Sequence, residues 1–95
     1  MPVDKQQTAM QDKIEERIIE LSGMLTIKLS KVESYADLSE TEKIPFRVMQ
    51  AEIRALKEYS VGEDLDYWLK RCIDEEQYCA SEGIKRVKQF IKQIS

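Results

Sequence analysis

The chain has 95 residues, of which 35% are charged and 42% hydrophobic, with a formal net charge of −3 and no histidine. These values predict one soluble helical domain and disfavour a typical nucleic-acid binder, which would carry a basic surplus. Without histidine the most common general base and metal ligand are missing, so we assign no catalytic residue, metal or cofactor. No apolar run suits a transmembrane helix and the first residues lack a signal-peptide pattern, so we expect a cytoplasmic protein without membrane association.

The first half of the chain carries one long helical pattern. Residues 1–7 are polar, and we expect them to fray. From Thr8 onward apolar residues recur at steps of three and four, which predicts a helix over about residues 8–36. Gly23 lies on the polar side of this helix and costs about 1 kcal/mol relative to alanine, so it marks the weakest point. The apolar stripe consists of Met10, Ile14, Ile18, Leu21, Leu25, Leu29, Val32 and Ala36.

A capping box precedes the second helix. Ser39 and Glu42 have the spacing at which each side chain bonds the other residue's backbone N–H. Pro45 follows closely, and proline is best tolerated in the first turn of a helix. Either a separate short turn precedes the helix, or the helix begins at Pro45. We place it over about residues 45–60, with Gly62 as its C-terminal cap.

The third pattern is the longest continuous stripe. It predicts a helix over about residues 64–94 that begins at Asp64, with a weak point at Ser81–Gly83. Cys72 and Cys79 lie two turns apart on it, roughly 10.5 Å along the axis, too far for a disulfide. We expect both to be reduced and structural. The stripe contains Leu65, Leu69, Ile73, Ala80, Ile84, Val87, Ile91 and Ile94.

The fold class expected from these patterns is all-α, a single domain over residues 1–95 built as a three-helix bundle of long, short and long helices. The short helix can cover only about half of either long helix, judged by a rise of about 1.5 Å per residue. We therefore expect a homodimer that pairs the first and third helices. The alternative is a compact monomer of four or five helices with breaks near Gly23 and Gly83.

Three charged residues interrupt the apolar stripes. Glu76 falls near the centre of the third helix face, and Lys28 and Arg17 lie at the edge of the first. A buried carboxylate must be paired, hydrogen-bonded or protonated. These residues form a candidate buried polar site. The structural interpretations are an ion pair, a Glu76 side chain that reaches solvent through a gap where the second helix has ended, or a polar contact that sets the register of a dimer. The functional interpretation is a ligand or catalytic site.

Aromatic and basic residues outside the stripes form a candidate interaction surface. Exposed aromatic side chains favour a protein-binding patch. The favoured function is therefore a small protein-interaction module that presents helix faces to a protein partner. One alternative is a helical enzyme or small-ligand binder around Glu76, and a weaker one is a nucleic-acid-linked regulator using the basic end of the last helix. The surface comprises Tyr67, Trp68, Tyr78, Lys85, Arg86, Lys88 and Lys92.

Overall fold

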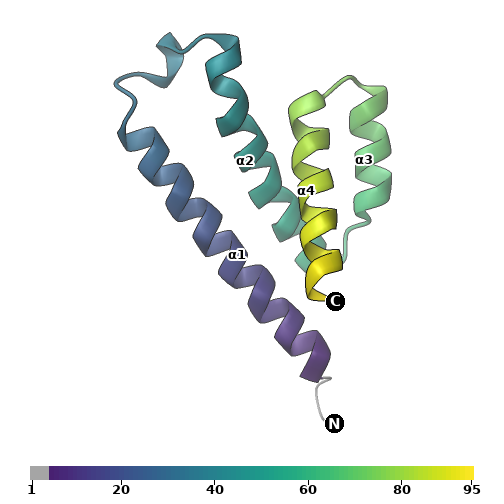
Figure 1. Cartoon of the computed structure of the whole chain (residues 1–95). Coiled ribbons are helices and arrows are strands. Elements are labelled where there is room, and N and C mark those ends of the chain that lie inside the picture. The colour runs from purple at the N-terminus through teal and green to yellow at the C-terminus, as the bar shows by residue number, and fades with distance from the viewer. Residues whose placement is uncertain (1–4) are drawn as a thin grey trace.

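In a computed structural model of the chain, the backbone is described for residues 5–95 and the side chains from residue 9 onward. Four α-helices form nearly all of this part (Figure 1). They are α1 (Lys5–Ser30), α2 (Glu40–Ser60), α3 (Leu65–Asp74) and α4 (Tyr78–Ile94), with a short 3-10 helix, η1 (Tyr35–Asp37), after α1. The all-α class is thus confirmed, and the four-helix alternative fits the helices observed. None of the described helices has the length and unbroken apolar character that a bilayer-spanning segment requires.

The helices lie side by side in the order α1, α2, α4, α3 (Figure 1). The contact between α2 and α4 is the most extensive, while α1 packs on the other side of α2 and α3 packs on α4. The most deeply buried large side chains come from α1, α2 and α4. They are Ile14, Leu56 and Val87, one from each of these helices. One face of α1 covers this core, and its opposite face has no neighbouring helix among the described residues.

Helix α1 is continuous through Gly23, so the expected break at that glycine does not occur. It ends at Ser30, before the expected boundary at residue 36, and Tyr35 of η1 then packs edge-on against Phe46 of α2 with ring centroids 5.6 Å apart. The apolar stripe predicted that the helix continues to residue 36. Instead, the chain leaves the helix and the aromatic contact holds it against α2. The expected fraying of residues 1–4 lies outside the described residues, and residues 5–7 are helical.

Helix α2 begins five residues earlier than expected, because its capping box forms. The backbone N–H of Glu42 donates to the Ser39 hydroxyl at 3.2 Å, and the Ser39 N–H donates to the Glu42 carboxylate at 3.1 Å. The bond from the Ser39 backbone N–H lowers the pKa of the Glu42 carboxyl most, and the Ser39 side chain lowers it further. Pro45 is accommodated inside the helix, where it gives up one backbone hydrogen bond without ending the helix.

The expected single helix over residues 64–94 is two helices, α3 and α4, and this prediction was wrong. The chain turns at Glu76, which has a left-handed backbone with φ of 58°. The N–H of Gln77 donates to the Cys72 carbonyl and that of Glu76 to the Ile73 carbonyl, which is the Schellman pattern of a helix end. Helix α4 then runs unbroken through Gly83, so the alternative prediction of a break there is wrong.

Candidate functional site

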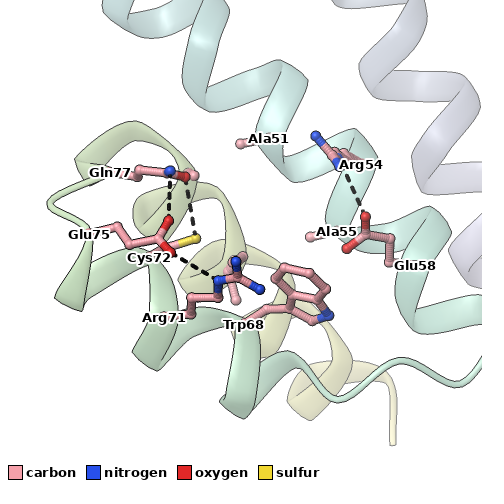
Figure 2. A pocket seen from close by; sticks show the side chains of 11 residues that line it. Ala51, Arg54, Ala55, Glu58, Trp68, Arg71, Cys72, Glu75 and Gln77 are labelled. Carbon is pink, nitrogen blue, oxygen red and sulfur yellow. Dashed lines mark hydrogen bonds and ion pairs between the residues drawn. The ribbon is translucent and has the colours of Figure 1, made fainter.

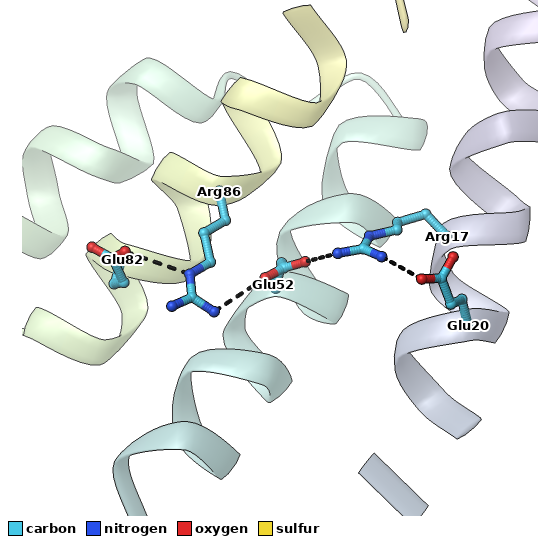
Figure 3. Close-up of polar contacts among 5 residues, drawn as sticks. All are labelled: Arg17, Glu20, Glu52, Glu82 and Arg86. Atoms are coloured by element: carbon cyan, nitrogen blue, oxygen red, sulfur yellow. Dashed lines mark hydrogen bonds and ion pairs between the residues drawn. The ribbon is translucent and has the colours of Figure 1, made fainter. Parts of the chain in front are cut away.

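A buried carboxylate lies where α1, α2 and α4 meet, and it belongs to Glu52 (Figure 3). Only 5% of Glu52 is exposed. Its carboxylate accepts a hydrogen bond from Arg17 of α1 at 3.3 Å and lies 3.9 Å from the guanidinium of Arg86 of α4. Arg17 also bonds Glu20 at 2.7 Å, and Arg86 bonds Glu82 at 3.4 Å. The result is a row of alternating charges across three helices.

The two arginines flank Glu52 on either side, which favours a structural role for this row. Each arginine contacts two carboxylates, so Glu52 has the compensation that a buried carboxylate needs. The Arg17 guanidinium also lies over the Phe90 ring, 5.8 Å from its centroid. Sequence reasoning found Arg17 but missed Glu52, although Glu52 lies between Met49 and Ala55 on the apolar side of its helix.

The candidate buried polar site of Glu76, Lys28 and Arg17 does not form. Glu76 is exposed in the turn between α3 and α4, and Lys28 is exposed near the end of α1. No ion pair among the described residues joins Glu76 to either cation, and Arg17 pairs with Glu20 and Glu52 instead. The prediction that Glu76 is buried was wrong, because the left-handed turn lifts it off the stripe it would occupy in a continuous helix.

A hollow of about 250 Å³ lies between α2, α3 and α4 (Figure 2). At one edge the Arg71 guanidinium stacks 5.5 Å from the Trp68 ring centroid and bonds Glu75 at 2.9 Å. Burial, and then the charge of Glu75, raise the pKa of the Cys72 thiol in this hollow. The thiol is therefore a weak nucleophile. The lining residues are Ala51, Arg54, Ala55, Glu58, Trp68, Arg71, Cys72, Glu75, Gln77, Ala80 and Ile84.

The hollow offers no catalytic set among the described residues. Its two arginines are each paired with a carboxylate four residues further along the chain, Arg54 with Glu58 at 3.1 Å and Arg71 with Glu75. No group of three or more potential metal ligands occurs in the described residues. Cys72 and Cys79 are both free thiols. The raised pKa of Cys72 disfavours an activated cysteine in this hollow.

The aromatic members of the candidate interaction surface are only partly together. Tyr67 and Trp68 touch edge-on at the start of α3, with ring centroids 5.9 Å apart, but Trp68 is half-buried and donates to Glu63 at 3.4 Å. Tyr78 lies at the start of α4, beyond the turn that follows α3, and is exposed. Tyr67 and Tyr78 thus remain available to a partner at separate places.

The basic members of that surface point to different sides of α4. Arg86 faces Glu52 of α2, whereas Lys88 forms an ion pair with Asp66 of α3. Helical spacing puts Lys85 and Lys92 on the face between them, away from the core. The structure therefore does not gather these cations into one patch.

The outer side of α1 is a further candidate surface, which was not predicted from the sequence. Ile19 is 72% exposed and Ile27 is 58% exposed. Met24, which lies between them in the sequence, is also exposed. These three residues lie outside the apolar stripe that the sequence predicts for this helix. A second apolar stripe of Ile19 and Ile27, eight residues apart, was the available signal.

Comparisons with protein-family models, with curated proteins and with solved structures give no match for this chain.

Proposed function

We propose that this chain is a small cytoplasmic protein-interaction module, such as an adaptor, an inhibitor or an accessory protein of a mobile element. One observation carries the proposal: Ile19 and Ile27 are exposed on the side of α1 that faces away from the bundle, and Met24 is exposed beside Ile27. Single exposed apolar residues are ordinary, but a cluster of them on a soluble domain marks an interaction surface. The module works by presenting helix faces and performs no chemistry of its own.

The arrangement of charged groups supports this choice over an enzyme. The enzyme or ligand-binding alternative needs Arg17 to contact a ligand, but Arg17 forms ion pairs with Glu20 and Glu52. Glu76 is exposed on the turn after α3, and the hollow beside Cys72 holds arginines that are already paired. An enzyme or ligand site would need a gathered set of uncompensated groups.

The paired cations of α4 weigh in the same way against a nucleic-acid-linked regulator. Arg86 and Lys88 each contact a carboxylate of another helix. Binding to a phosphate backbone would require these cations to leave their carboxylates, and affinity for nucleic acid depends on the number of phosphates neutralised.

Site-specific photo-crosslinking tests the proposal. A photoreactive amino acid replaces Ile19 or Ile27 in the whole chain, expressed in its native host. A matched control replaces Lys70, an exposed polar residue of α3. We expect a discrete covalent adduct with a protein, identified by mass spectrometry, from positions 19 and 27 and none from position 70. If neither position yields more adduct than the control, the outer side of α1 is not an interaction surface.

A further inference from the structure

The outer strip of α1 consists of Ile19, Gly23 and Ile27. Residues four apart lie on one face of a helix, so these three form a continuous line. The same spacing places Ile14 and Leu21, which are 1% and 3% exposed, on the opposite side, against the bundle. The strip therefore points directly away from the core.

Gly23 forms a notch in the middle of this strip. A Cβ atom added at Gly23 would meet nothing within 4 Å, and the residue has an ordinary helical backbone. Nothing in the described fold requires a glycine here, in contrast to Gly83, where a Cβ would collide with α2. A notch between two exposed isoleucines is the shape that admits the backbone of a second helix at close range.

We infer that this strip binds a second copy of the chain, with the two α1 helices antiparallel and crossing at Gly23. The inference rests on the proposed function and names the partner. Ile19 and Ile27 each lie four residues from Gly23, one before and one after it. A two-fold axis at Gly23 therefore sets Ile19 of each chain in the same layer as Ile27 of the other, which makes the strip complementary to itself.

The charges along α1 select the antiparallel direction. Before Gly23, residues 12–22 hold four acids and two cations, whereas residues 24–31 hold two lysines and no acid. Glu16 lies seven residues before Gly23, about 20° from it around the helix, and Lys31 lies eight residues after it, about 80° away on the same side. An antiparallel pair brings Glu16 of one copy near Lys31 of the other. A parallel pair would instead set Glu16 against Glu16.

The other exposed faces lack this complementarity. The sequence-based expectation of pairing through a long third helix loses its basis, because α3 and α4 are separate helices that turn back on each other. Ile73 and Tyr67 are exposed on α3, but helical spacing sets them about 120° apart around that helix. The strip on α1 is accordingly the surface expected to hold the second copy.

Light scattering over a concentration series tests the inference. A single helix pair is a small interface, for which dissociation constants near the micromolar range are ordinary. We expect the average mass to rise from 11.1 kDa toward twice that value between about 5 µM and about 500 µM. Ile19→Glu and Ile27→Glu should each keep the protein monomeric. The matched control is Ile73→Glu, an exposed isoleucine on α3, which should dimerise as the wild type does.

Gly23→Gln separates a loss of binding from a loss of folding. Glutamine is the better helix former and has open space at position 23, so the melting temperature of the dilute protein should rise. The same side chain fills the notch and should weaken dimerisation by at least tenfold. A variant that merely unfolded would lower both quantities.

Charge exchange tests the antiparallel direction. Glu16→Lys and Lys31→Glu should each weaken the dimer, and the double variant should recover wild-type association because the pair is re-formed with its signs exchanged. Additive weakening in the double variant would overturn the antiparallel arrangement.

A wild-type mass that stays at 11.1 kDa over the whole series would overturn the inference, and so would loss of dimerisation in Ile73→Glu but not in Ile19→Glu. Photo-crosslinking keeps the proposed function separate. A monomeric protein that forms an adduct with a different protein from position 19 contradicts the second copy alone, whereas no adduct and no dimer contradict both.

Discussion

Gly83 of α4 packs against Ala51 of α2 with no room for a side chain between them. A Cβ atom added at position 83 would lie 2.6 Å from the Cβ of Ala51 and 2.8 Å from the backbone nitrogen of Glu52. Because the obstacle includes backbone, it cannot rotate away. The closest crossing of α2 and α4, the two helices with the most extensive contact, thus depends on the glycine.

We expect Gly83→Ala to lower the free energy of unfolding by about 1–3 kcal/mol, the usual cost of overpacking. The loss should appear although alanine is the better helix former. The matched control is Gly23→Ala, where space is open, and it should raise the free energy of unfolding by about 0.5–1 kcal/mol. Urea denaturation of dilute protein measures both. Changes of the same sign at the two glycines would contradict the close packing of Gly83.

Arg17 and Arg86 should contribute unequally to stability although both contact Glu52. The Arg17 guanidinium lies 3.3 Å from the Glu52 carboxylate, and the Arg17 side chain is 30% exposed. The Arg86 guanidinium lies 3.9 Å from the same carboxylate, and the Arg86 side chain is 56% exposed. We expect Arg17→Ala to cost about 1–3 kcal/mol, because it leaves a buried acceptor short of a donor. Arg86→Ala should cost less than about 1 kcal/mol because water screens that pair.

The control for the two arginines is Arg54→Ala, since Arg54 is 81% exposed and pairs only along its own helix. Its substitution should change stability by less than about 0.5 kcal/mol. Equal losses at Arg17, Arg86 and Arg54 in thermal denaturation would show that burial of Glu52 plays no part.

Glu76 occupies a backbone conformation that favours glycine. A residue with a side chain pays about 1–2 kcal/mol in the left-handed region, so Glu76→Gly should stabilise the protein by about 1 kcal/mol. Glu76→Gln keeps the backbone cost and removes only an exposed charge, so its effect should stay within about 0.5 kcal/mol. Destabilisation by the glycine would argue that α3 and α4 form one continuous helix.

The two thiols should differ in reactivity. Burial, and then Glu75, raise the pKa of Cys72, so its thiolate forms only at a pH above the usual range. Because the thiolate is the reactive form, alkylation of Cys72 by iodoacetamide should lag behind that of the less buried Cys79 and accelerate at higher pH. Peptide mass spectrometry follows each site. Equal rates, or a disulfide between them, would contradict the structure of α3 and α4.

The helical class and the core stripes could be predicted because amphipathic spacing depends on local sequence. Ile14, Leu21, Ile84 and Val87 were all placed on stripes, and all are buried. The sequence also shows the capping box at Ser39, but a helix start at Pro45 is five residues later than the observed start of α2. The hydrogen bonds of the cap, together with packing of the first turns, outweighed the one bond that Pro45 removes.

The errors came from features that sequence spacing does not encode alone. The turn at Glu76 uses a residue other than the glycine that usually ends a helix in this way, although the polar run Asp74–Gln77 was a hint. Gly83 resembled a weak point because its contact, Ala51, lies on another helix. Glu52 was missed for the same reason: its partners come from α1 and α4, and only the tertiary arrangement brings them together.

The most direct test of the central claim is a concentration series of methyl NMR spectra, with the isoleucine methyl groups labelled. The claim is that exposed residues of α1 form the interaction surface and bind a second copy. We predict that the methyl signals of Ile19 and Ile27 shift as the protein is concentrated, while those of Ile44 and Ile73, which are also exposed, remain in place. Signals of Ile19 and Ile27 that do not change with concentration, or a shift confined to Ile73, would contradict it.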